Sequence, residues 1–196
     1  MLFESCHVLK HMTVKYLNID EAILEKHGAI HTAREVSGQP ELWYCAFNKV
    51  LSANQKITSF LDDLFKDLKK IILIIGEDIS AFLGNSIEGI LQRKSKITTV
   101  TVPTTHLVSR SKDYEQDSIP TLVNSFAKSG NSSESVVAVK LSDKHYETRH
   151  HLVITCNSEG SLAKQKFNDK SLAITGSYSN MLLTALLIMI SIIWNP

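Results

Sequence analysis

Five aliphatic residues in a row, Ile-Ile-Leu-Ile-Ile at positions 71–75, decide which fold classes are open to this chain. The run is rich in β-branched residues and ends at Gly76, a pattern typical of a strand buried on both faces. A strand of this kind lies inside a parallel sheet that helices cover on both sides. We therefore expect an α/β fold.

The pattern continues along the chain. Further strands are predicted at residues 97–102, 121–126 and 151–155, with helices between them at 80–91 and 134–141. Strands that alternate with helices at this spacing predict a doubly wound parallel sheet in a three-layer α/β/α arrangement. Upstream of the sheet, helices are predicted over residues 20–28, 40–51 and 57–68. Pro40 is expected in the first turn of the second of these helices, where its missing N–H has no consequence.

A loop rich in serine, glycine and asparagine follows the strand predicted at 121–126. Residues 125–135 read Ser-Phe-Ala-Lys-Ser-Gly-Asn-Ser-Ser-Glu-Ser and lead into a predicted helix. Backbone N–H groups at such a junction bind anions, and small hydroxyl side chains add donors without bulk. This composition favours a phosphate, whereas an aspartate-rich loop would favour a metal ion. An ordinary helix N-cap cluster explains the same residues equally well.

The topology of a doubly wound sheet brings a second loop to the same place. Strands 71–75 and 121–126 are expected side by side across the point where the strand order reverses, and ligands bind beyond the carboxyl ends of strands at that point. The loops that leave these strands, residues 76–80 and 127–132, both contain glycine and serine. The geometry therefore supports an anion site without reference to any family.

The composition of the chain limits the kinds of molecule that it is expected to bind. The chain has 196 residues, of which 43% are hydrophobic, and a net charge of +1. This predicts one globular domain without the clustered lysines and arginines of a nucleic-acid surface. Three widely spaced cysteines and no signal-peptide pattern favour a reducing cytoplasm. We expect no metal and no cofactor, because no zinc-like spacing and no dinucleotide-binding glycine pattern is present.

Residues 181–194 are almost wholly apolar. A membrane helix needs roughly 18 or more such residues, so a run of this length predicts a buried core helix. A tail anchor is the alternative, and the absence of flanking lysines or arginines weakens it. We expect no membrane association. His150 and His151 are predicted to form an exposed turn at a strand entry, and Cys156 to be a small buried residue.

Several of these segments together resemble the sugar isomerase (SIS) domain in the N-terminal half of tagatose-6-phosphate ketose/aldose isomerases, also described as galactosamine-6-phosphate deaminase/isomerases. The resemblance is strongest at residues 125–135. It extends in consistent order over roughly residues 24–190 and includes these other segments: 24–35, 39–43, 80–84, 102–108, 154–157 and 176–177. It implies a five-stranded parallel sheet between helices. We therefore assign residues 1–23 to an N-terminal extension and 24–196 to a single SIS domain, with the second SIS domain of the family absent.

The resemblance also implies which residues bind the phosphate of a phosphosugar. In the family, the serine- and threonine-rich loop after the third strand holds the phosphate together with the serine after the first strand. By position, these contacts fall on Ser129, Asn131, Ser132 and Ser80, with Lys128 and Gly130 shaping the loop.

The chain departs from the family pattern at three places. Glu77 and Asp78 replace small residues beside the implied phosphate, where like charges at roughly 4–6 Å cost one to several kcal/mol at an effective dielectric near 20. Residues 165–171 are too few for the fifth strand that the family places there, so the edge strand is expected to be missing. The family's catalytic glutamate and histidine lie in the absent half, which leaves the catalytic residues of this chain unknown.

Three functions follow as expectations. The first is a phosphosugar-binding SIS domain that resembles an aldose/ketose isomerase or deaminase of amino-sugar or hexose 6-phosphates but is catalytically incomplete. The second is a non-catalytic module that senses phosphosugars, and the third is an inactive truncated product. By resemblance alone, we also expect a homodimer.

Overall fold

The computed structural model describes residues 15–65, 71–76, 79–114, 119–145, 149–164, 171–175 and 178–194. Glu77 and Asp78, whose effect on the first loop was predicted above, lie outside these residues, as do residues 1–14. Contacts along the chain divide it into two compact units, Met1–Leu42 and Trp43–Pro196. The domain boundary predicted at residue 24 stays a prediction.

The first unit contains a short hairpin and the helices next to it. Strands β1 (Lys15–Tyr16) and β2 (Ile19–Asp20) pair antiparallel. The two residues between them, Leu17 and Asn18, have φ of 56° and 64°, as a type I′ turn requires. Helix α1 (Glu21–Lys26) follows and confirms the helix predicted at 20–28, although the Asp20 side chain makes no capping hydrogen bond.

Helix α2 (Ile30–Ser52) starts ten residues before the predicted position. The prediction that Pro40 opens this helix is therefore wrong, because Pro40 lies in its interior. Proline leaves the carbonyl four residues upstream without a donor. That residue, Val36, is 42% exposed, so water can hydrate the carbonyl in place of the lost bond.

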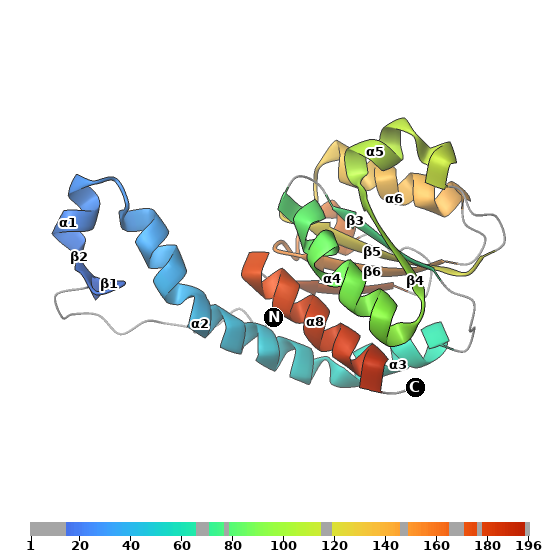
Figure 1. Ribbon diagram of the computed structural model, residues 1–196, viewed down its shortest axis with the longest axis horizontal. Helices are drawn as coiled ribbons and strands as arrows, with labels where there is room; N and C mark the ends of the chain where they lie inside the picture. The colour runs from blue at the N-terminus through green and yellow to red at the C-terminus, as the bar shows by residue number, and fades with distance from the viewer. Residues whose placement is uncertain are drawn as a thin grey trace. The chain divides into compact units, whose positions relative to one another are not determined.

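The second unit is built on one five-stranded sheet (Figure 1). Its strands are β3 (Ile71–Gly76), β4 (Thr98–Pro103), β5 (Thr121–Ala127), β6 (Arg149–Thr155) and β7 (Ser171–Thr175). All four pairings are parallel, and the order is β4-β3-β5-β6-β7. The strand order reverses between β3 and β5, so the predicted doubly wound sheet and its switch point are confirmed.

The expectation of a missing edge strand is wrong. Strand β7 pairs with β6 over its whole length, from His151 opposite Ser171 to Thr155 opposite Thr175. The fifth strand begins at Ser171, the last residue of the segment predicted to be too short, and a short helix, α7 (Ser161–Lys164), lies between β6 and that segment. The sheet therefore has the five parallel strands that the resemblance implied.

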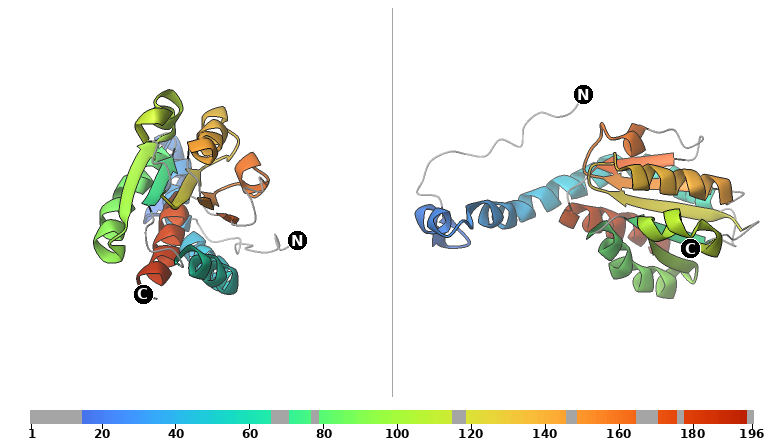
Figure 2. Two further views of the ribbon diagram at one scale, coloured as in Figure 1. Left: turned by 90° about the vertical axis from the view of Figure 1, so that its right-hand side faces the viewer. Right: turned by 90° about the horizontal axis from the view of Figure 1, so that it is seen from above.

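Helices cover both faces of the sheet, as an end-on view shows (Figure 2). The helices of this unit are α3 (Asn54–Phe65), α4 (Ile79–Ser95), α5 (Thr104–Ser109), α6 (Ser133–His145), α7 and α8 (Tyr178–Trp194), with a 3-10 turn η1 (Ser111–Tyr114) after α5. Helices α3, α4 and α8 pack on one face around Leu122, Phe126 and Leu152. Helices α5, α6 and α7 pack on the other face around Val123, Val153 and Leu162.

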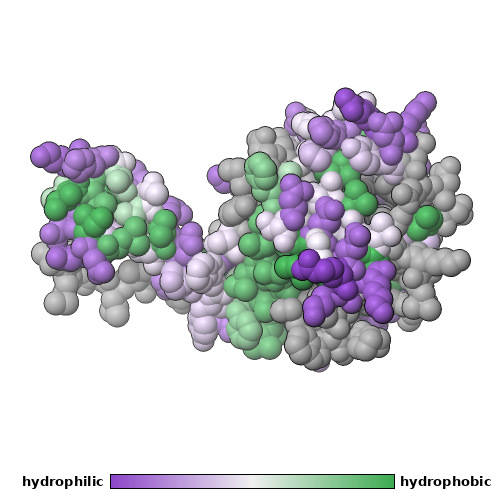
Figure 3. All heavy atoms as spheres, in the orientation of Figure 1, coloured by the Kyte–Doolittle hydropathy of each residue, from purple (hydrophilic) through white to green (hydrophobic). Residues whose placement is uncertain are grey.

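Helix α8 confirms the core helix predicted from the apolar run at 181–194. Met181, Ala185 and Ile188 are buried in the first core cluster, whereas Leu182 and Leu186 are only partly buried. Hydrophobic residues gather at the surface next to the start of this helix (Figure 3). Within the parts of the chain that the structure describes, no helix has both the length and the apolar character to cross a membrane.

The two adjacent histidines of β6 are buried, so the prediction of an exposed turn is wrong. His150 is 3% exposed and its ring packs edge-on against Phe60, with 5.9 Å between centroids. His151 is fully buried, and its Nε2 lies 2.9 Å from Asp143 Oδ1 of α6. Each histidine fills a place in the layer between sheet and helix because β6 is an inner strand, between β5 and β7.

Candidate functional site

The candidate site lies at the carboxyl edge of the sheet, where β3, β5 and β6 end. In register, Gly76 of β3 pairs with Phe126 of β5, and Ala127 of β5 pairs with Thr155 of β6. The segments that leave these strands therefore start at the same edge. After Gly76, the last residue of β3, the described chain resumes at Ile79 in the first turn of α4.

Ser80 lies in that first turn and is 6% exposed. Gly76 is packed so closely against it that a Cβ on Gly76 would lie 2.5 Å from the Ser80 carbonyl carbon and oxygen. Only glycine allows this approach of strand end to helix start. The segment thus holds Ser80 at the end of β3, next to the end of β5.

The 128–132 loop, which follows β5, contains the other predicted site residues. Lys128, Ser129 and Asn131 are exposed, while Gly130 is buried and has φ +66°. A Cβ on Gly130 would also lie 3.3 Å from Thr155 Oγ1. The positive φ favours glycine here and the short contact adds to that preference, in agreement with its predicted role in shaping the loop.

Ser132 forms the junction between this loop and α6. Its Oγ accepts a hydrogen bond from the backbone N–H of Ser135 at 3.3 Å and donates one to Ser135 Oγ at 2.8 Å. Its carbonyl accepts the first helical bond, from Val136 N at 3.1 Å. Ser132 is therefore the N-cap of α6, as the alternative interpretation of this loop required.

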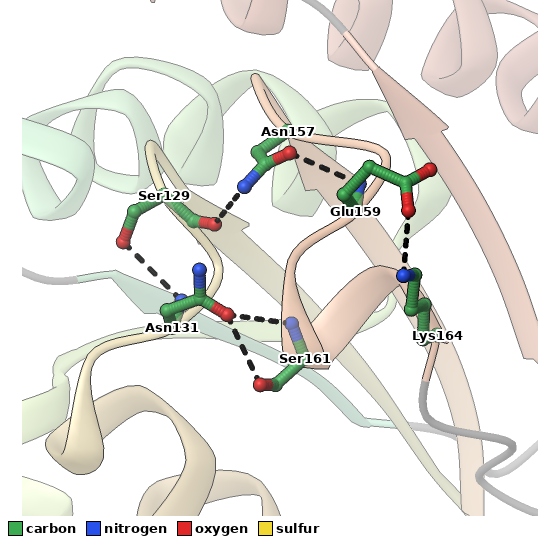
Figure 4. A network of polar contacts seen from close by, with 6 residues as sticks. All are labelled: Ser129, Asn131, Asn157, Glu159, Ser161 and Lys164. Atoms are coloured by element: carbon green, nitrogen blue, oxygen red, sulfur yellow. Dashed lines mark hydrogen bonds and ion pairs between the residues drawn. The ribbon is translucent and has the colours of Figure 1, made fainter.

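A second loop, residues 156–160 after β6, packs against the first (Figure 4). Asn157 Nδ2 donates to the Ser129 carbonyl at 3.1 Å. The Ser161 N–H and hydroxyl both donate to Asn131 Oδ1, at 2.8 and 3.0 Å. The two loops thus form one polar network at the edge of the sheet.

Sequence reasoning missed the 156–160 loop as part of the site. Asn157 entered only as part of the resemblance at 154–157, and Gly160 and Ser161 did not enter at all. The signal was present, because the run Asn-Ser-Glu-Gly-Ser at 157–161 follows a buried strand and, like the loop after β5, is rich in serine, glycine and asparagine. Two such loops on neighbouring parallel strands must lie side by side.

Cys156 also lies at this edge and is exposed, so the prediction that it is buried is wrong. It comes directly after the last residue of β6, where the chain leaves the sheet. Partial burial raises the pKa of its thiol, and the positive charge of Lys128 opposes this shift. The thiol Sγ lies 3.9 Å from Met181 Sδ.

Charge around the two loops is mixed. Glu159 forms an ion pair with Lys164 at 2.6 Å, and both side chains are more than half exposed. Glu134 lies in the first turn of α6 and accepts a hydrogen bond from Ser133 Oγ at 3.2 Å. Among the described residues, no three His, Cys, Asp or Glu side chains are grouped as a metal ion would require.

Comparisons with known proteins agree with this architecture. No protein-family model matches the chain. A protein from Streptomyces coelicolor, provisionally named a D-galactosamine-6-phosphate deaminase, is 36% identical over 173 residues. The match covers 81% of this chain and 45% of that protein. A D-galactosamine-6-phosphate deaminase from Shewanella sp. is 33% identical over 182 residues, with 84% and 47% covered.

A solved structure gives the same result. The crystal structure of a protein from Clostridium novyi, provisionally described as a tagatose-6-phosphate ketose/aldose isomerase, superimposes with a TM-score of 0.80 and 38% identity. It covers 92% of this chain and 50% of the other. The chain thus spans about half the length of the curated relatives it matches.

Proposed function

Because this chain is a sugar isomerase (SIS) domain homologous to galactosamine-6-phosphate deaminases and tagatose-6-phosphate ketose/aldose isomerases, we propose that it binds a phosphosugar. The ligand would be an amino-sugar or hexose 6-phosphate. Its phosphate would lie at the 128–132 loop, with Ser80 on the side of β3. This assignment of the predicted site residues is part of the proposal.

The observation that carries the proposal is the position of the 128–132 loop. It follows β5 directly at the switch point, and it ends in the capped N-terminus of a 13-residue helix. The N-terminal end of such a helix has a partial positive charge and points free N–H groups outward. A phosphate at this end of α6 would meet them together with the exposed Lys128 and Ser129.

The chemistry of the relatives sets the expectation for activity. Moving a proton between C1 and C2 of an opened sugar requires a positioned acid/base pair. No pair among the described loop residues matches the glutamate and histidine that the resemblance places in the other half of the family. We therefore expect the 196-residue chain to bind phosphosugars without converting them.

Thermal unfolding tests the proposal. Galactosamine 6-phosphate at about 100 times its Kd should stabilise the folded chain by roughly 2.7 kcal/mol, which is easily seen as a shift in Tm. Galactosamine without phosphate serves as the control and should leave the Tm unchanged. A cooperative transition that neither galactosamine 6-phosphate nor tagatose 6-phosphate moves would refute phosphosugar binding. The expected homodimer stays a prediction, which sedimentation of the same sample would check.

A further inference from the structure

We propose that the 156–160 loop positions the 128–132 loop for anion binding, and that Asn157 is the positioning residue. This inference rests on the proposed function. The residues of the 156–160 loop would not themselves touch the ligand.

Three consecutive residues of the 128–132 loop have backbone carbonyls that accept hydrogen bonds from β6 and the segment that follows it. The Lys128 carbonyl accepts from Thr155 Oγ1 at 3.5 Å, and the Gly130 carbonyl accepts from Leu162 N at 3.0 Å. Between them, the Ser129 carbonyl accepts from Asn157 Nδ2 at 3.1 Å. All three carbonyl oxygens thus face β6 and the loop that follows it.

The orientation of these carbonyl groups determines the orientation of the backbone N–H groups of the residues that follow them. In a planar trans peptide, the C=O and the N–H of the next residue point to opposite sides. The N–H groups of Ser129 and Gly130 therefore point away from the 156–160 loop. An anion on that side meets N–H dipoles and is kept apart from the negative ends of the carbonyls.

Asn157 is itself held in one orientation. Its Oδ1 accepts from Glu159 N at 3.0 Å, and its backbone N–H donates to Thr155 Oγ1 at 3.2 Å. Because the carboxamide oxygen is engaged within its own loop, the Nδ2 group can point only toward Ser129. An asparagine suits this position because its side chain combines an acceptor and a donor on a short stem.

Gly160 brings the two loops close enough for this contact. A Cβ at Gly160 would lie 2.5 Å from the Ser129 carbonyl oxygen and 3.2 Å from Gly130 Cα. Any side chain would push the loops apart and lengthen the Asn157–Ser129 bond. The contact therefore depends on the absence of a side chain at Gly160.

Three variants of the full chain test the inference. Asn157→Ala removes both carboxamide functions. Asn157→Ser keeps an oxygen that can accept from Glu159 N but is too short to reach Ser129, so it preserves the turn and removes only the bond between loops. Glu159→Gln is the matched control, because it removes the exposed ion pair with Lys164 and leaves the Ser129 contact in place.

Two readouts separate positioning from stability. Calorimetric titration gives the Kd for galactosamine 6-phosphate, and ¹H–¹⁵N spectra report the Ser129 and Gly130 amides during the same titration. We expect the Kd to rise about tenfold in both Asn157 variants, with a smaller ligand-induced shift of the two amides. Glu159→Gln should leave the Kd and both amide shifts unchanged.

The outcomes are distinct. A purely structural role would lower the Tm of the Asn157 variants but leave the Kd of the folded protein within twofold of the original, which would overturn the inference alone. Loss of cooperative unfolding in both variants would overturn it too, because Asn157 would then hold the fold together. Failure of the unaltered chain to bind the phosphosugar would refute the proposed function, and the inference with it.

Discussion

Replacement of Gly160 by alanine gives the most direct test of how the two loops pack. The added Cβ would lie 2.5 Å from the Ser129 carbonyl oxygen, whereas ordinary contacts start at about 3.4 Å. Since the atom it meets is backbone, the loops must separate by nearly an ångström. The 2.8–3.1 Å hydrogen bonds from Ser161 to Asn131 and from Asn157 to Ser129 would then exceed hydrogen-bonding distance.

The magnitude follows from those losses. Overpacking of a tight contact costs about 1–3 kcal/mol, and each lost hydrogen bond about 0.5–1.5 kcal/mol. Because the loops can relax at the surface, we expect Gly160→Ala to lower the free energy of unfolding by about 2–3 kcal/mol. For a chain of this size, that corresponds to a decrease in Tm of about 4–12 °C.

Urea denaturation followed by circular dichroism measures this change. Gly89→Ala is the matched control, because Gly89 lies in helix α4 and the nearest atom to a Cβ there is 4.0 Å away. That substitution should raise stability by about 0.5–1 kcal/mol. If Gly160→Ala differs from the unaltered chain by less than about 0.5 kcal/mol, the loops are not packed as the structure shows and the reasoning fails.

Two further predictions concern single side chains at the same edge. Ser132→Ala should lower the free energy of unfolding by about 1 kcal/mol through loss of the α6 N-cap. Ser133→Ala, which loses only an exposed contact with Glu134, should leave it unchanged. Urea denaturation of both variants measures the difference, and equal midpoints would contradict the capping role. Cys156 should react slowly with iodoacetamide at pH 8 despite its exposure, because its pKa is raised and less thiolate is present, and the rate should climb as the pH rises above the ordinary cysteine pKa. Lys128→Gln removes the charge that opposes the shift and should slow the reaction further; mass spectrometry of the Cys156 peptide measures the rate, and an unchanged rate would contradict this account.

Local patterns predicted the sheet well. The aliphatic run at 71–75 and its terminal Gly76 correspond to β3, and the β3–β5 neighbourhood followed from the doubly wound topology alone. Hydrophobic periodicity and β-branched runs are local properties of the sequence, so such elements can be read without the structure. Strand β7 was not predicted, because the strand is formed by Ser-Leu-Ala-Ile-Thr at 171–175 and the length of the segment before it carries no information about these residues.

The errors at Pro40, His150 and His151 have a different cause. In each case the position of the residue in the fold differs from the one its residue type usually prefers, which is the first turn of a helix for proline and an exposed site for histidine. The proline is tolerated in the interior of α2, next to exposed residues, and the histidines are accommodated in an inner strand, where Phe60 and Asp143 contact them. Tertiary context of this kind leaves no trace in a single sequence.

At the site, too, the residues recognisable from their own segment were predicted, and those that depend on distant parts of the chain were not. The 128–132 loop was found from its own composition, but its partners lie 27–30 residues away in the chain. The composition of residues 157–161 indicated a second polar loop, but the individual contacts at that spacing follow only from the pairing of β5 with β6, which brings the two loops together. The predicted binding residues were thus located, whereas the residues that hold them were not.

The hydrogen bonds of the 128–132 loop also rank its predicted contacts. Ser132 Oγ is engaged in capping α6, and Asn131 Oδ1 accepts from Ser161, which leaves the Asn131 Nδ2 group as a donor. Ser129 Oγ accepts from Asn131 N at 3.2 Å and keeps its own hydroxyl proton available to donate. A phosphate at this edge would therefore receive its hydrogen bonds from the Ser129 hydroxyl, from Asn131 Nδ2 and from backbone N–H groups of the loop and of the first turn of α6. Substitution of Ser132 should therefore act chiefly on stability, because its hydroxyl holds the loop against α6. Ser129→Ala should act chiefly on affinity, because its hydroxyl proton is available to a phosphate.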